Sequence, residues 1–190
     1  VMGIETREIW HKDVIPEDFT KEDWIVLPGG FSYGDYLRCG AIARFSNVMA
    51  SVIDFANAGG KVLGVCNGFQ ILCESHLLPG VLLRNKDQKF ICKNIHLRTE
   101  TGNTILTGRL NEGDVLKIPI AHAEGRFHAS DETLQELIAN DQILFKYCDE
   151  NGNINEESNF NGALHAIAGI CNAGRNVFGS QYERVLPASS

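Results

Sequence analysis

The sequence predicts an α/β fold with a mostly parallel sheet, helices on both of its faces and an antiparallel extension. Two short apolar runs, Trp24 to Leu27 and Lys61 to Val65, indicate buried strands bounded by Gly or Pro signals. Between them, apolar residues recur every three or four positions from Ile42 to Ala56, which indicates a helix that Gly59-Gly60 ends. Two strands joined through a helix favour parallel neighbours, because the crossover helix covers the sheet.

The pattern changes after Leu78-Pro79-Gly80 to shorter alternating segments separated by Gly- and Asn-containing turns. We expect antiparallel strands there, near Phe90 to Leu97, Thr104 to Leu106 and Val115 to Ile120. A second helix is predicted from Asp131 to Asn140, with Ser130 as its N-cap. The remaining expected elements are a strand, an exposed hairpin or loop, and two further strands: Ile143 to Cys148, Asp149 to Asn161, Ala166 to Ile170 and Asn176 to Phe178.

Length and composition predict one globular domain spanning residues 1–190, with 44 % hydrophobic and 22 % charged residues. The formal net charge of −7 argues against a nucleic-acid partner, since phosphate binding depends on Lys and Arg. No apolar run approaches the roughly 20 residues that span a bilayer, so no membrane association is expected. Six cysteines without a C-x-x-C pair favour a reducing, cytoplasmic location and no metal site.

The segment from Gly64 to Gln70 carries the clearest chemical signal. It places Cys66 between two glycines, at the end of a buried strand and the start of an apolar helix. This G-x-C-x-G pattern is typical of a nucleophile elbow, in which a sharp turn projects the thiol above the sheet. The helix N-terminus favours thiolate over thiol. Most cysteines are buried core residues, but this setting favours a catalytic nucleophile, whereas the other five cysteines keep the core interpretation.

Several long motifs in order resemble one enzyme family, the class I glutamine amidotransferases, and among them the glutaminase subunits of phosphoribosylformylglycinamidine synthase. The resemblance runs from about Trp24 to Gly179, and its motifs are Pro28 to Ala43, Gly64 to Gln70, Leu78-Pro79-Gly80, Arg84-Asn85, Lys89-Phe90, Pro119 to Gly125 and Ala168 to Ile170. It implies the flavodoxin-like fold of class I amidotransferases, with the site at the carboxyl ends of the strands.

The resemblance also implies the roles of site residues. Cys66 would attack the glutamine side-chain amide, giving a glutamyl thioester and ammonia without a metal. The oxyanion hole would use amides of Gly29 or Gly30 and of Asn67. Gln70 lies one helical turn after Cys66 and is expected to contact glutamine. The remaining expected glutamine contacts are His122 and Glu124, which sit two apart at a strand end.

The sequence departs from this family at both ends. Relatives begin with a buried strand, which we expect to be missing here. Relatives also carry a catalytic histidine after the last strand, but no histidine follows Gly179. Aligning Glu183 with the family's catalytic glutamate places Gln181 at the position of the base. An alternative function therefore stays open: a non-catalytic or impaired docking subunit of the same complex.

The resemblance further implies partners. A synthetase subunit would consume the ammonia and hold ATP and Mg²⁺, because this chain has no G-x-x-x-x-G-K-[ST] loop and no cofactor of its own is expected. A small third subunit is expected in the same complex. A redox sensor or peptidase relative could use the same cysteine elbow, but neither explains the Phe-Ser-Tyr-Gly-Asp run at residues 31–35.

Overall fold

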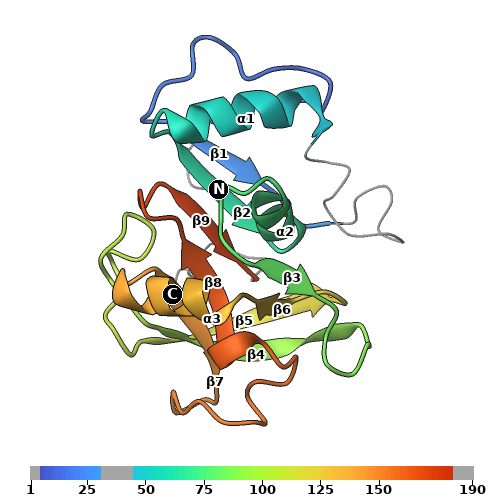
Figure 1. The fold of residues 1–190 in the computed structure, drawn as a ribbon, viewed down its shortest axis with the longest axis vertical. Coiled ribbons are helices and arrows are strands. Elements are labelled where there is room, and N and C mark those ends of the chain that lie inside the picture. The colour runs from blue at the N-terminus through green and yellow to red at the C-terminus, as the bar shows by residue number, and fades with distance from the viewer. Residues whose placement is uncertain (1–4, 31–44, 182–190) are drawn as a thin grey trace.

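The computed structural model describes residues 5–30 and 45–181, and it shows an α/β fold built on a seven-stranded mixed sheet (Figure 1). The strand order of that sheet is β1-β2-β9-β8-β7-β4-β5, and β3 with β6 forms a separate two-stranded sheet. The strands are β1 (Trp24–Leu27), β2 (Lys61–Val65), β3 (Val81–Leu83), β4 (Ile91–Thr99), β5 (Val115–His122), β6 (Arg126–His128), β7 (Ile143–Cys148), β8 (Ile167–Cys171) and β9 (Val177–Ser180).

The strands β1, β2 and β9 form the parallel part of the sheet. Leu27 of β1 pairs with Gly64 of β2, and Val65 of β2 pairs with Ser180 of β9. The sequence-based expectation that the first two of these strands are parallel neighbours is confirmed. Because the three strands run in one direction, their carboxyl ends meet at one edge of the sheet, where Cys66 follows β2.

The strands β8, β7, β4 and β5 continue the sheet in antiparallel pairs, in the lower half of Figure 1. The predicted α/β fold class and its antiparallel extension are confirmed, but the sheet is mixed rather than mostly parallel as expected. Within residues 5–30 and 45–181, two neighbouring pairs of the large sheet are parallel and four are antiparallel. The antiparallel part is thus larger than the sequence indicated.

Three α-helices accompany the sheet in the described part of the chain: α1 (Asn47–Asn57), α2 (Asn67–Glu74) and α3 (Asp131–Ala139). The first helix buries Met49, Val52 and Ala56, as its spacing predicted. It begins at Asn47, however, and Phe45, which the spacing placed on the buried face, is exposed, while the expected start at Ile42 lies outside the described residues. The N-cap prediction for α3 is confirmed, because the Ser130 hydroxyl accepts a hydrogen bond from the Thr133 amide at 3.2 Å. No helix among the described residues combines the length and apolarity that crossing a membrane requires.

The strand expected at Thr104 to Leu106 is wrong, because this segment forms turns. The Thr104 hydroxyl accepts a hydrogen bond from the Thr107 amide at 3.1 Å and lies 2.7 Å from the Thr107 hydroxyl. Threonine side chains that bond nearby backbone amides compete with strand pairing. The sequence reading also missed the short strands β3 and β6, which are three residues long and have too little alternation to detect.

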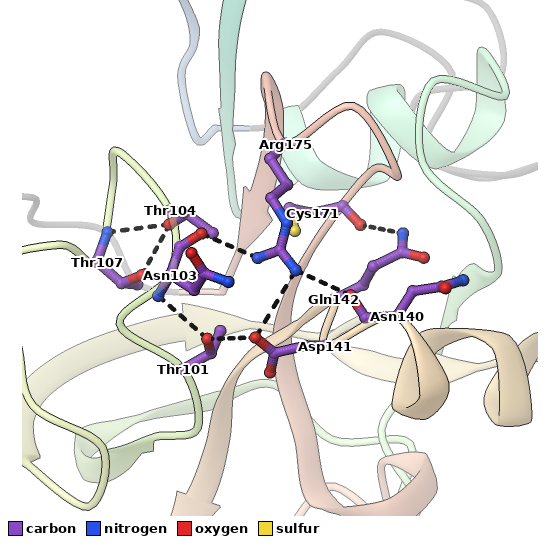
Figure 2. Close-up of polar contacts among 9 residues, drawn as sticks. All are labelled: Thr101, Asn103, Thr104, Thr107, Asn140, Asp141, Gln142, Cys171 and Arg175. Atoms are coloured by element: carbon purple, nitrogen blue, oxygen red, sulfur yellow. Dashed lines mark hydrogen bonds and ion pairs between the residues drawn. The ribbon is translucent and has the colours of Figure 1, made fainter.

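Arg175 joins the β8–β9 turn to two neighbouring segments (Figure 2). Its guanidinium donates to the backbone oxygens of Asn103 at 2.9 Å and Asn140 at 3.0 Å, and it lies 3.7 Å from the Asp141 carboxylate. Asp141 in turn accepts from the Thr101 hydroxyl at 2.7 Å. This cluster lies beside the start of β9, at the opposite end of that strand from Cys66, so we interpret it as structural.

Candidate active site

Cys66 occupies a strained turn between β2 and α2. Its backbone angles are φ 53° and ψ −107°, which place a non-glycine residue in a sparsely populated region. The Cys66 backbone amide donates to the backbone oxygen of Ser180 at 2.9 Å, and the Cys66 backbone oxygen accepts from the backbone amide of Gln70 at 3.2 Å. Bonds to β9 on one side and α2 on the other hold this conformation. The nucleophile elbow expected from the sequence is therefore present in the backbone geometry.

Two glycines allow the close packing around this elbow. A Cβ on Gly68 would lie 2.0 Å from the Leu27 backbone oxygen, and one on Gly64 would lie 2.6 Å from the Gly68 backbone. Both distances are far below the ordinary contact range of 3.4–4 Å. Only glycine lets the first turn of α2 approach β1 and β2 this closely. Glycine at these two positions thus determines how close the first turn of α2, which follows Cys66, lies to the sheet.

The Pro28-Gly29-Gly30 turn follows β1 directly, at the same edge of the sheet as Cys66. Gly29 and Gly30 are exposed, and Gly30 has φ 137°, a conformation that side chains rarely adopt. Packing of Gly68 against Leu27 brings this turn beside the first turn of α2, where Asn67 lies. The structure therefore gathers the residues expected to form the oxyanion hole, while the role of their amides stays a prediction.

Gln70, one turn after Cys66 on α2, is almost fully buried. Its amide nitrogen donates to a Glu124 carboxylate oxygen at 2.8 Å, and the other Glu124 oxygen lies 3.5 Å from the Arg84 guanidinium. The structure thus brings together two of the predicted glutamine contacts, Gln70 and Glu124. It adds Arg84, which the sequence analysis noted only as part of a family motif.

Asn85 holds the segment that carries Glu124. Its amide nitrogen donates to the His122 oxygen at 2.9 Å, and its side-chain oxygen accepts from the Gly125 amide at 3.1 Å. The Asn85 backbone amide also donates to the Ala123 oxygen at 2.9 Å. These bonds fix the backbone on both sides of Glu124. In the sequence, Asn85 stood out only as part of the Arg84-Asn85 motif, and an asparagine by itself is common in ordinary turns.

His122 lies deeper than the sequence suggested, with only 4 % of its surface exposed. Its ring packs against the backbone of Gly125, and neither ring nitrogen has a hydrogen-bond partner among the described residues. Burial lowers the pKa of His122 to about 4. The imidazole is therefore neutral at pH 7 and a weak base. Its expected contact with glutamine stays a prediction.

Tyr147 is a buried polar group near the elbow that sequence reasoning missed. Burial raises the pKa of its hydroxyl, and the charge of Cys66 raises it further, while the hydrogen bond from Asn161 acts against them. That bond joins the Asn161 amide nitrogen to the Tyr147 oxygen at 3.2 Å. The same Asn161 nitrogen donates to the Gly125 oxygen at 2.9 Å. A tyrosine inside an apolar strand carries no sequence signal for such a position.

Gln181, which the alignment placed at the position of the base, is 1 % exposed. Its backbone amide donates to the Ala168 oxygen at 3.1 Å, while neither atom of its side-chain amide has a hydrogen-bond partner in the described chain. An uncharged amide cannot take a proton from Cys66. Glu183, the other expected catalytic residue, lies outside the described residues.

Other features of the described chain lie away from this edge. Two surface cavities of about 350 and 400 Å³ are lined by residues around His76 and Asn172, and around Lys93 and Asp149, and neither is lined by Cys66. Among residues 5–30 and 45–181, no cluster of His, Cys, Asp and Glu side chains could hold a metal ion. Burial raises the pKa of Cys148 and of Cys171 to about 11, so both thiols are protonated at pH 7.

Comparisons with known proteins agree on one family. Residues 2–179 match the model of the CobB/CobQ-like glutamine amidotransferase domain. The chain is 54 % identical to phosphoribosylformylglycinamidine synthase subunit PurQ of Sulfurimonas denitrificans, over 94 % of this chain and 77 % of that protein. The corresponding Synechocystis subunit is 53 % identical, over 92 % and 76 %. A solved structure titled PurLQS from Thermotoga maritima superposes with a TM-score of 0.75 at 37 % identity, covering 90 % of this chain and 70 % of that one.

Proposed function

The chain belongs to the CobB/CobQ-like glutamine amidotransferase family, and on that premise we propose that it is the glutaminase subunit of a phosphoribosylformylglycinamidine synthase. The enzyme hydrolyses glutamine to glutamate and ammonia, and the ammonia serves the synthesis of formylglycinamidine ribonucleotide in purine biosynthesis. Identities above 50 % to synthase subunits support this activity and do not favour the alternative of an impaired docking subunit.

The observation that carries the mechanism is the strained backbone of Cys66 at the N-terminus of α2. In the proposed reaction the Cys66 sulfur bonds to the side-chain carbonyl carbon of glutamine, the carbon–nitrogen bond breaks, and ammonia leaves with the thiol proton. Water then hydrolyses the thioester, which releases glutamate and restores the thiol. We propose that the backbone amides of Asn67 and of Gly29 or Gly30 donate hydrogen bonds to the oxyanion of the tetrahedral intermediate.

The proposal also includes partners. A synthetase subunit would bind ATP and Mg²⁺ and take up the ammonia, and a small third subunit would join the same cytoplasmic complex. The match to the solved PurLQS structure supports the synthetase contact. Size-exclusion chromatography with both subunits, glutamine and nucleotide present should show one co-eluting complex. Separate elution of this chain under those conditions would contradict the assignment.

Active-site labelling tests the nucleophile. The diazo-ketone 6-diazo-5-oxonorleucine, which mimics glutamine, should modify Cys66 and leave Cys92 intact, although Cys92 is exposed. Iodoacetamide, which needs only an accessible thiol, should modify Cys92 and so serves as the control for reactivity. Peptide mapping by mass spectrometry reads both. Equal modification of Cys66 and Cys92 by the diazo-ketone would show that no glutamine pocket surrounds Cys66.

A further inference from the structure

Tyr147 is a buried tyrosine at the edge of the sheet where Cys66 lies. It is the next-to-last residue of β7, and its exposed fraction is 0 %. The strand β7 runs antiparallel to β8, β8 runs antiparallel to β9, and β9 runs parallel to β2. The carboxyl ends of β7, β9 and β2 therefore share one edge, so Tyr147 lies at the same end of the sheet as the elbow.

Asn161 holds the phenol oxygen of Tyr147. Its amide nitrogen donates one hydrogen to the Gly125 backbone oxygen at 2.9 Å and the other to the Tyr147 oxygen at 3.2 Å. Its side-chain oxygen accepts from the Ala163 backbone amide at 3.1 Å, so the amide group cannot turn around without losing these bonds. Asn161 is itself fully buried. The Tyr147 oxygen is thus an acceptor in a fixed network, and its proton must point away from Asn161.

The hydroxyl proton of Tyr147 has no acceptor in the part of the chain that the structure describes, where the bond from Asn161 is the one hydrogen bond of this hydroxyl. Burial raises the pKa of the hydroxyl, so it keeps its proton at physiological pH. A buried donor without an acceptor costs free energy, and the large majority of buried polar groups have partners. The proton is therefore available to a group that becomes negatively charged, as the Cys66 sulfur does when it loses its own proton.

Electrostatics link this hydroxyl to the elbow. Burial raises the pKa of Tyr147 most, and the negative charge of Cys66 raises it further, so the two side chains lie within range of each other's charge. The relation is reciprocal, because a neutral hydroxyl with its positive end free favours a nearby anion, and it does so more strongly in a buried, low-dielectric setting than in water. The sequence has no histidine after Gly179 that would assist Cys66.

We propose that Tyr147 is a positioning residue that stabilises the thiolate form of Cys66, with Asn161 orienting its hydroxyl so that the O–H dipole lies toward the sulfur. The effect adds to that of the N-terminus of α2, which also favours the thiolate. The hydroxyl keeps its proton throughout, so no covalent bond to it forms or breaks. The consequence for catalysis rests on the glutaminase function proposed above, in which this thiolate attacks the glutamine amide.

Other ionisable groups near Cys66 lie on the segments that follow β3 and end β5. Glu124 lies 3.5 Å from the Arg84 guanidinium. Burial lowers the pKa of His122 to about 4, so its imidazole is neutral at pH 7. The charged residues of β2 and α2 lie at the far ends of those elements from the elbow, and β9 has none. A variant that changes only Tyr147 leaves all of these groups in place.

The test measures the rate at which iodoacetamide modifies Cys66 in the full chain, as a function of pH, by peptide mapping. This small reagent reacts with the thiolate and needs no glutamine site, so the midpoint of the rate profile reports the charge on the sulfur. Tyr147→Phe removes only the hydroxyl and keeps the ring, which packs edge-on against Phe160 at 5.1 Å between centroids. The midpoint should rise by about one pH unit, so the rate at pH 7 should fall roughly 10-fold, as expected when a charged group loses a donor.

Thr99→Val is the matched control. Thr99 lies on the neighbouring strand β4 and is fully buried, and its hydroxyl has no partner among the described residues. Removal of this hydroxyl should leave the midpoint unchanged. An unchanged midpoint in Tyr147→Phe would overturn the proposal, since the hydroxyl would then serve packing alone. An equal rise in Thr99→Val would overturn it too.

A second variant keeps the proposal testable if Tyr147→Phe fails to fold. Replacement of Tyr147 by 3-fluorotyrosine nearly keeps the shape of the side chain and makes the hydroxyl a stronger donor, because fluorine withdraws electrons from the ring. The midpoint should then lie below that of the native chain by a fraction of a pH unit. A midpoint at or above the native value would refute the role of Tyr147.

The labelling experiments also distinguish failure of this inference from failure of the proposed function. If 6-diazo-5-oxonorleucine modifies Cys66 and Cys92 equally, the glutaminase function falls, while the iodoacetamide profile still decides the role of Tyr147. If the diazo-ketone selects Cys66 and Tyr147→Phe keeps the native midpoint, the glutaminase function stands and the role of Tyr147 is refuted.

Discussion

Replacing Gly68 by alanine should lower both the stability of the fold and the reactivity of Cys66. Two effects of opposite sign act on the stability, so the sign of the measured change shows which of them prevails. Helix propensity alone favours alanine over glycine by about 1 kcal/mol. Against it, the new Cβ would lie 2.0 Å from the Leu27 oxygen and 2.7 Å from the Leu27 carbonyl carbon. Both are backbone atoms, so no side-chain rotation relieves the overlap.

We expect the overlap to prevail, because overpacking of a well-packed interior costs typically 1–3 kcal/mol and sometimes more. Because the overlap is with backbone atoms, we take its cost at the upper end of that range, about 3 kcal/mol. After the propensity gain of about 1 kcal/mol, Gly68→Ala should lower the free energy of unfolding by about 2 kcal/mol, or roughly 4–8 °C in Tm for a chain of this size. If α2 instead shifts by about 1 Å to make room, Cys66 shifts with it, and the rate of diazo-ketone labelling should fall by about 10²-fold.

Urea denaturation followed by circular dichroism measures the stability, and peptide mapping measures the labelling. Gly113→Ala is the control, because its exposed turn has no atom within 4 Å of the added Cβ. The control carries only backbone strain from φ 89°, of about 1 kcal/mol, and should leave labelling unchanged. An increase in the stability of Gly68→Ala would show that propensity wins and that the close approach to Leu27 does not hold the elbow.

Two further variants test buried polar groups. His122 has its pKa lowered to about 4, so its contribution to stability is complete above the unfolded pKa of 6.5 and is lost as pH falls toward 4. Between pH 7 and pH 5 the native chain should lose about 2 kcal/mol more stability than His122→Asn, and a matching slope in both would contradict the buried neutral imidazole. The exposed His128→Asn should keep the native slope. Gln181→Met should stabilise the chain by about 1–3 kcal/mol in urea denaturation, because it removes a buried amide that has no hydrogen-bond partner among residues 5–30 and 45–181. Gln142→Met should destabilise it, since Gln142 donates to the Cys171 oxygen at 2.8 Å, and equal effects of the two would refute the distinction.

Sequence patterns predicted the parallel strands β1 and β2, helix α3 with its Ser130 cap, and the turn at Cys66. Each of these depends on residues a few positions apart. The threonines at 104 and 107 show where the same reasoning fails, because their side chains bonded locally in a segment that resembles a strand. Glu183 lies outside the described residues, so its role in catalysis stays a prediction.

By itself, the sequence determined the family and the elbow, since a cysteine between two glycines at a strand end constrains its own backbone. Tertiary structure decided which side chains meet there. Gln70 and Glu124 are 54 residues apart, and their hydrogen bond exists only because β5 ends beside α2. The burial of His122 and the exposure of Arg84 have the same origin. Local patterns set the backbone of each element, whereas contacts between elements depend on strand order and on the packing of whole segments, which no short window of residues contains.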